Sequence, residues 1–313
     1  LRHSKNKDGI LYGLSSLLAV TSFFIPSTSG RAALSLPILQ QLGSLFSKKE
    51  QKVLAVLAPV VILMSTSATL IGAGSHLIGV SLLESMTGQS ISYTQWFVWG
   101  VPFTIVITAC TVCIIQRVLW PKQIIKAENS SQLTQDYDKM TQPLNDKEKK
   151  MLILIPCLII GWVTESIHGF DIAFVTMAGA LFVMMPKYGV IDWKEGMKSV
   201  SLSLIMFVAC ATALGKVLMA TGVITWIEHR MMHTLHLFAE DPEWLIVLMI
   251  LLITVTSHLY ITSHTTRAIV FIPSLLMFSE SMGLDPAAAV FLSLVGLNYC
   301  VTFPVSSKAL LLF

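Results

Sequence analysis

Charged residues are scarce in this chain. Only 12% of its 313 residues are Asp, Glu, Lys or Arg, whereas 54% are hydrophobic and the mean hydropathy is +0.72. So few charges cannot cover the water-facing surface of a soluble protein of this length. The composition therefore excludes an ordinary soluble domain and indicates a membrane protein.

The signatures of several other classes are missing as well. The sequence contains no HExxH, no GxSxG and no paired Asp in its apolar segments, so a membrane-embedded hydrolase is disfavoured. Its five cysteines suggest no disulfide framework, and the CxxC at Cys110 and Cys113 lacks His partners, which favours helix packing over a metal or redox role. A net charge of +3 gives no reason to expect nucleic acid as a partner.

Long apolar runs are what the sequence has in abundance. They are continuous, whereas the strands of a membrane barrel would alternate apolar and polar residues. Runs of this kind suit helices that cross about 30 Å of hydrocarbon. Clear examples are residues 96–120, 151–163, 172–185 and 202–214. We therefore predict an all-α polytopic membrane protein.

The distribution of charge suggests how the chain enters the membrane. Residues 10–46 begin and end beside basic segments, which mark the cytoplasmic side, and residues 243–282 begin and end beside acidic ones. Each segment is too long for one crossing and is interrupted by polar residues in its middle. We predict two re-entrant helical hairpins that enter from opposite sides.

An interrupted apolar segment follows each hairpin. Residues 53–83 are broken at "TLIGAGSHLIG" and residues 287–313 at "TFPVSSKA". Two broken units of opposite orientation predict an inverted repeat, the architecture of secondary transporters with a site near the midplane. We expect residues 1–95 to form the first repeat and 243–313 the second. The connecting helices then occupy 96–242, with a cytoplasmic loop at 121–149.

The interruptions carry hydroxyl and cationic side chains. Hydroxyl groups and N–H groups at a half-helix N-terminus can bind an anion, whereas unwound carbonyls can bind a cation. Neither motif contains Asp or Glu, and an ionisable group at membrane depth suggests function. We therefore predict a small anionic substrate. The candidate substrate-binding residues are Ser27, Thr28, Ser29, Arg31, His76, Ser263, His264, Thr265, Arg267 and Lys308.

Structural roles for the same residues stay open at this point. Arg31 and Arg267 can bridge backbone carbonyls, and the two histidines can be satisfied polar groups of the helix packing. Lys308 can reach the cytoplasmic surface along its aliphatic stem. The hydroxyl groups of the tips can bond carbonyls of their own helices.

The motifs "STSGRAALSLP" and "SHTTRAIVFIP", followed by "TLIGAGSH" and "FPVSSKA", resemble those of the divalent anion:sodium symporter (DASS) family of the ion transporter superfamily. The resemblance implies a transport domain of two hairpins and two broken helices, a scaffold domain that holds a homodimer, and elevator-like movement of di- or tricarboxylates or sulfate. It also implies that scaffold helices before Leu1 and a final helix after Phe313 are absent from this chain.

The departures from the family pattern concern sodium. In the family each tip reads Ser-Asn-Thr, and Thr28 and His264 stand where the two Asn residues occur. His76 and Lys308 stand at the downstream Asn positions. The resemblance places sodium near Ser27, Gly72 and Ser263, but the lost Asn residues put those sites in doubt. His76 and Lys308 can supply a fixed positive charge in place of bound Na⁺, which predicts a sodium-independent carrier.

The sequence therefore predicts a secondary transporter of small divalent anions that works by anion exchange or proton coupling. The alternatives are a sodium-coupled symporter of the same fold and, in a different class, an anion channel. No cofactor other than Na⁺ is expected. We expect an integral membrane protein of the bacterial inner membrane.

Overall fold

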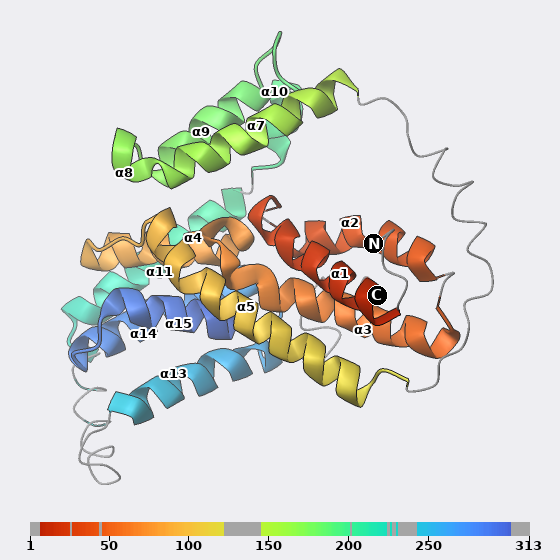
Figure 1. Ribbon diagram of the computed structural model, residues 1–313. Coiled ribbons are helices and arrows are strands. Elements are labelled where there is room, and N and C mark those ends of the chain that lie inside the picture. The colour runs from red at the N-terminus through yellow and green to blue at the C-terminus, as the bar shows by residue number, and fades with distance from the viewer. Residues whose placement is uncertain are drawn as a thin grey trace. The chain divides into compact units, whose positions relative to one another are not determined.

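The computed structural model describes residues 7–25, 27–43, 46–121, 145–200, 202–223, 226, 230 and 243–301. The elements within these ranges are α-helices joined by short 3₁₀ turns (Figure 1). Two compact units are present. The first comprises the described residues of Leu1–Ile91, Trp96–Ile125 and Phe207–Phe313, and the second those of Ser92–Gln95 and Lys126–Met206.

The first unit begins with a helical hairpin. Helix α1 (Lys7–Val20) continues into the turn η1 (Thr21–Phe23), and α2 (Thr28–Gly43) returns from it. Helix α3 (Lys48–Met64) packs against both, and its first turn is closed by a capping box between Ser47 and Glu50.

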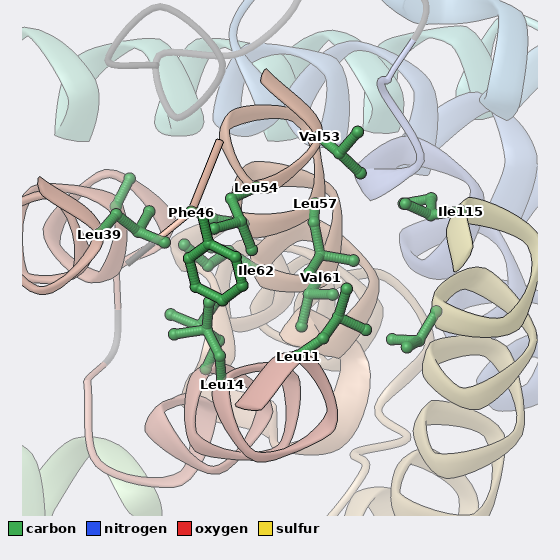
Figure 2. Close-up of a cluster of buried hydrophobic side chains, with 14 residues drawn as sticks. Leu11, Leu14, Leu39, Phe46, Val53, Leu54, Leu57, Val61, Ile62 and Ile115 are labelled. Atoms are coloured by element: carbon green, nitrogen blue, oxygen red, sulfur yellow. The ribbon is translucent and has the colours of Figure 1, made fainter. Parts of the chain in front are cut away.

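A cluster of buried aliphatic side chains joins these helices. Leu57 and Val61 of α3 are fully buried and face Leu11 and Leu14 of α1 (Figure 2). Phe46 belongs to the same cluster and makes an edge-to-face contact with Trp120. In a membrane such packing is stabilised by close contact, since lipid tails are as apolar as leucine.

Helix α3 gives way to irregular backbone at the predicted interruption. Two 3₁₀ turns, η2 (Ser65–Ala68) and η3 (Leu70–Gly72), separate it from α4 (Gly74–Thr87). Every residue of the two turns is buried, so their polar groups need partners within the protein. Helix α5 (Tyr93–Val118) follows, and the indole of Trp96 donates to the carbonyl of Ser67 at 3.0 Å.

The remaining helices of the first unit repeat the order of the N-terminal ones. Helix α11 (Leu202–Ala220) spans residues of both units. Helix α13 (Glu243–Thr256), the turn η4 (Ser257–Leu259) and α14 (His264–Ser281) form a second hairpin. Helix α15 (Pro286–Asn298) packs against α13, α14 and α4.

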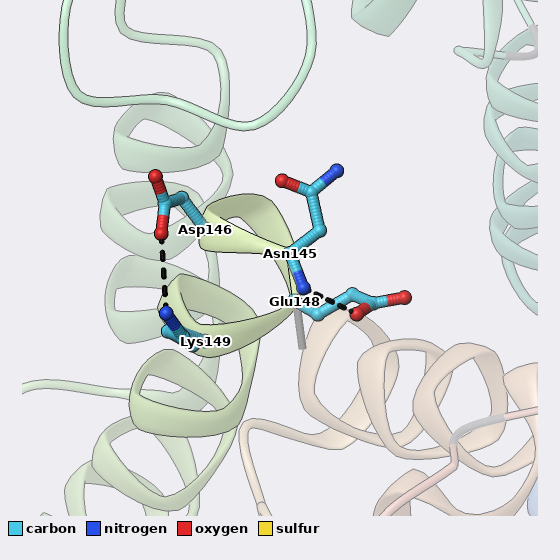
Figure 3. Close-up of polar contacts among 4 residues, drawn as sticks. All are labelled: Asn145, Asp146, Glu148 and Lys149. Carbon is cyan, nitrogen blue, oxygen red and sulfur yellow. Dashed lines mark hydrogen bonds and ion pairs between the residues drawn. The ribbon is translucent and has the colours of Figure 1, made fainter. Parts of the chain in front are cut away.

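The second unit contains α7 (Asp146–Val163), α8 (Glu165–His168), α9 (Ile172–Val183) and α10 (Trp193–Lys198). At the start of α7, the Glu148 carboxylate accepts from the Asn145 backbone at 2.8 Å, and Lys149 pairs with Asp146 at 3.3 Å (Figure 3). This polar turn begins α7 ahead of the apolar run at 151–163, inside the segment that the sequence assigns to a loop.

Helices α7 and α9 pack through two glycines. A β-carbon on Gly161 of α7 would lie 2.8 Å from Val175 of α9, and one on Gly179 of α9 would lie 2.5 Å from Leu158 of α7. Each glycine therefore receives a branched side chain from the other helix. Small residues at such contacts are typical of helix pairs in membranes.

The helices agree closely with the predicted segments. Two helical stretches among the described residues, Lys48–Ala68 and Tyr93–Val118, are long and apolar enough to cross a membrane. The first is mostly buried by other helices, whereas the second exposes most of its apolar surface, including Ile105 and Val106. The predicted loop at 121–149 falls largely outside the described residues, as does the interruption at "TFPVSSKA".

Candidate functional site

The two hairpin tips have the same local structure. The hydroxyl of Ser27 accepts a hydrogen bond from the backbone of Gly30 at 3.1 Å, and that of Ser263 accepts one from Thr266 at 3.3 Å. One residue further on, the amides of Arg31 and Arg267 each donate to the corresponding serine carbonyl at 2.9 Å. Each serine is thus the N-cap of the returning helix and brings an arginine into its first turn.

The correspondence extends back through the turn before each tip. Thr21 and Ser257, which have the same sequence separation as the two serines, bond with their hydroxyls to carbonyls three residues earlier. Their own carbonyls accept from two backbone amides each, three and four residues later. The helix begins at Thr28 in one tip and at His264 in the other, so the non-helical interruption is shorter than the hydroxyl pattern predicts.

Arg31 is held inside the protein by the first helix break. Its side chain is 1% exposed, and Nη1 and Nη2 donate to Ser65 Oγ at 3.1 Å and Thr66 Oγ1 at 2.8 Å. Both hydroxyls in turn donate to the carbonyl of Ile62. The guanidinium therefore joins the first tip to the end of α3 without a carboxylate partner among the described residues.

Arg267 is buried but has fewer partners. Its side chain is 0% exposed, and Nη2 lies 3.1 Å from Nδ1 of His264. Nε and Nη1 have no hydrogen-bond partner among the described residues. A buried donor without a partner costs about 1–3 kcal/mol, so these two positions call for a ligand atom.

His76 lies in a polar network that joins the two halves of the unit. Nδ1 is 3.2 Å from the carbonyl of Thr69, so it carries the proton, and Nε2 accepts from Nδ2 of Asn298 at 2.6 Å. Ser75 donates to Oδ1 of the same amide at 3.1 Å. The ring also packs on Trp96, with centroids 4.6 Å apart. His76 is thus a neutral imidazole in this structure.

His264 is neutral for a similar reason. A guanidinium can only donate, so Nδ1 of His264 accepts from Arg267 and Nε2 carries the proton. That nitrogen lies 3.3 Å from the thiol sulfur of Cys300, which is fully buried just after α15. The net positive charge of the described part of the site therefore comes from the two arginines.

The second tip meets the start of α4. A β-carbon on Gly74 would lie 4.0 Å from Oγ1 of Thr265, which places the N-termini of α4 and α14 together. Helix α4 follows the extended residue Ala73, and no side chain of that residue caps its first N–H groups, which belong to Gly74 and Ser75. The positive ends of two helix dipoles and Arg267 converge here.

The predicted residues fall into distinct groups. Ser27 and Ser263 are exposed at the tips, and Thr28, Ser29 and Thr265 are partly buried in the first helical turns. Gly72 is buried in the first break, and Lys308 lies outside the described residues.

Several residues of the site were not predicted. They are Ser65, Thr66, Trp96, Asn298 and Cys300. Asn298 carries a detectable signal, because an amide at the end of a long apolar run needs partners. The two hydroxyls of the first break, in "LMSTSATL", are visible in the same way.

We expect the substitution Asn298→Leu to destabilise the first unit. It would leave Nε2 of His76 and the Ser75 hydroxyl without their present partner, at about 1–3 kcal/mol for each buried group. The measurement is the temperature at which the detergent-solubilised protein loses its monodisperse peak. Ser293→Ala is the matched control on α15, because Ser293 is buried and, among the described residues, bonds only to its own helix at Ala289. Equal melting temperatures for the two variants would contradict the network.

Comparison with known proteins identifies the chain's relatives. The family model of the sodium:sulfate symporter transmembrane region matches residues 5–313. The chain belongs to this family. The predicted resemblance to divalent anion:sodium symporters is thereby confirmed, and the chain is part of an integral membrane protein, as expected from its composition.

Individual relatives of this symporter-family chain are distant. It is 24% identical over 302 residues to a membrane protein of Cupriavidus necator, covering 95% of this chain and 57% of the relative. It is 21% identical to the sodium-dependent dicarboxylate transporter of Staphylococcus saprophyticus and to the citrate/succinate antiporter of Escherichia coli K12, covering 76% of this chain and 48% of each relative. The chain thus spans about half the length of the curated relatives it matches. All three relatives are bacterial, which agrees with a bacterial plasma membrane.

Proposed function

We propose that the protein is a secondary active transporter of small divalent anions, such as di- or tricarboxylates or sulfate, and not an enzyme. The observation that carries the proposal is the pair of buried arginines, one helical turn inside the two hairpin tips. Neither has a carboxylate partner among the described residues, and a buried cation at membrane depth is costly unless an anion or polar groups compensate it. Hydroxyl groups of the first break compensate Arg31, and an anionic substrate supplies the compensation for Arg267, whose Nε and Nη1 have no partner among the described residues.

The two hairpins and broken helices are proposed to form an inverted repeat that moves as an elevator. Support comes from the matched bonds at the two tips, where serine caps and arginine amides recur at equal sequence separation. The proposed repeats are residues 1–95 and 243–313, with 96–242 as connecting and scaffold helices. A homodimer in the lipid bilayer completes the proposal, and the exposed apolar face of α5 fits such surroundings.

Sodium coupling is proposed to be absent. Thr28 and His264 replace the two tip asparagines of the family, and His264 is bonded to Arg267 rather than placed to coordinate a cation. The guanidinium of Arg31 already occupies the hydroxyl groups of the first break. An antiporter among the relatives agrees with anion exchange, whereas the sodium-dependent relative supports the alternative of a sodium-coupled symporter.

The test is uptake of labelled succinate, citrate and sulfate into proteoliposomes that contain the full-length protein. Each anion is measured with and without a sodium gradient, and with or without unlabelled anion inside. We expect flux that requires internal anion and is unchanged when sodium is replaced by potassium. The control is liposomes without protein.

Other results would contradict specific parts of the proposal. Uptake that strictly requires sodium would show a sodium-coupled symporter and would sink the argument from the tip substitutions. Flux that does not saturate and is not stimulated by internal anion would show a channel. Absence of flux for all three anions would contradict the substrate class.

A further inference from the structure

The two buried arginines differ in the number of partners they have. They occupy equivalent positions, each four residues after the capping serine, and each is at most 1% exposed. Both terminal nitrogens of Arg31 donate to hydroxyls of the first break. Only one terminal nitrogen of Arg267 has a partner among the described residues, and that partner is the neutral His264. Nε lacks a described partner in both arginines, so the two side chains differ at their terminal nitrogens, of which both are bonded in Arg31 and one in Arg267.

The donors of Arg267 that have no described partner include two parallel N–H groups on one edge of the guanidinium. A guanidinium has five N–H groups, and two of its edges present a pair of parallel donors that match the two oxygens of a carboxylate or sulfate. One edge pairs Nη2 with Nε, and the other pairs Nη2 with Nη1. Nη2 carries two hydrogens, and His264 takes one of them. Nε and Nη1 are both without a described partner, so one complete edge remains whichever hydrogen His264 takes.

Other groups near Arg267 also favour an anion. The second tip, which carries Arg267 in its first helical turn, meets the uncapped start of α4 at Gly74 and Thr265. The amides of Gly74 and Ser75 there are potential donors at the positive end of a helix. The titratable groups beside Arg267 among the described residues include no carboxylate. His264 contacts both Arg267 and the Cys300 thiol, and His76 bonds to Asn298.

We propose that Arg267 binds one oxyanion group of the substrate through two parallel hydrogen bonds, whereas Arg31 is an internal cation that holds the first helix break and does not contact the substrate. The inference rests on the proposed transport function. It assigns different roles to two side chains that the sequence makes equivalent. The bound group is a carboxylate or a sulfate, because both offer two oxygens at the spacing of the guanidinium edge.

The roles predict different effects of a substitution that keeps the charge. Lysine cannot form the two-donor edge, so Arg267→Lys should weaken substrate binding by about tenfold or more. Arg31→Lys replaces the two nitrogens that reach Ser65 and Thr66 by a single ammonium nitrogen, so it should lower thermal stability and leave the substrate affinity of the folded fraction within about twofold.

The experiment measures both affinity and stability in the full-length protein. Succinate, citrate and sulfate are titrated into detergent-solubilised wild-type, Arg267→Lys and Arg31→Lys protein, and the ligand-induced rise in melting temperature gives the half-saturating concentration. Initial uptake rates in proteoliposomes give the KM of the same variants. Loss of affinity confined to Arg267→Lys is the expected result. Equal loss in both variants, or unchanged affinity in Arg267→Lys, would overturn the assignment.

A second measurement needs no variant. Both arginines are at most 1% exposed, so butanedione can modify them only in conformations that open the site, and peptide mass spectrometry reports the modified fraction at each position in the wild-type protein. Saturating succinate should protect Arg267 and leave the modification of Arg31 unchanged. No protection at Arg267, in protein whose melting temperature succinate raises, would overturn the assignment while leaving the transport proposal intact. Protein that neither binds nor transports any of the three anions would contradict both.

Discussion

Replacing Gly72 by alanine should abolish most of the folded protein. The added β-carbon would lie 2.0 Å from the carbonyl oxygen of Thr66, a backbone atom that cannot move without opening the turn between α3 and α4. Thr66 also accepts from Arg31, so the first tip would lose its attachment together with the turn. We expect a loss on the order of 3 kcal/mol or more, which few single substitutions reach. The measurement is the yield of monodisperse protein and its melting temperature.

Gly74 supplies a control two residues away. A β-carbon there would meet nothing nearer than Oγ1 of Thr265 at 4.0 Å, and alanine is a better helix former than glycine at the start of α4. Gly74→Ala should therefore melt within a few degrees of the wild type. Similar melting temperatures for both variants would show that the turn can relax around an added methyl group.

Truncating Trp96 to alanine should have the second large effect. The side chain is fully buried and contacts three elements: its ring packs on His76 and on Phe291, and its indole nitrogen donates to the Ser67 carbonyl. Loss of the ring would leave a cavity where the first break meets α15, at about 3–5 kcal/mol. Trp96→Phe keeps most of the packing and loses one hydrogen bond, at about 1 kcal/mol. The melting temperatures should therefore fall in the order wild type, Trp96→Phe, Trp96→Ala.

The control for Trp96 lies on α13. Trp244 is 61% exposed, so its replacement by alanine removes few protein contacts. We expect Trp244→Ala to melt close to the wild type. If Trp244→Ala lowered the melting temperature as much as Trp96→Ala, the contacts of Trp96 would not explain its effect.

The helical segments could be predicted from the sequence because membrane-spanning helices are long apolar runs in which polar residues stand out. A long apolar run that contains hydroxyls, glycine and a cation must be interrupted there, and this located both tips and the break before α4. The length of each interruption could not be predicted in the same way. Whether Ser27 caps a helix or lies in unwound backbone depends on one hydrogen bond to Gly30, and either conformation suits the same residues.

The partners of the buried charges were beyond the reach of the sequence. Arg31 and Arg267 occur in matching motifs, and only the three-dimensional arrangement shows Ser65 and Thr66 beside the first. The contact between His76 and Asn298 joins residues that are 222 positions apart in the sequence. Pairing of this kind is set by how the helices pack, and a single sequence does not record it.

The reciprocal glycines of α7 and α9 have a mechanical consequence. Val175 sits in the notch at Gly161 and Leu158 in the notch at Gly179, so sliding either helix along its axis would drive a branched side chain into the neighbouring backbone turn. The Trp162 indole, which donates to Thr176 at 3.1 Å, fixes the same register. These contacts oppose sliding of α7 along α9, so we expect the two helices to move together as one rigid body.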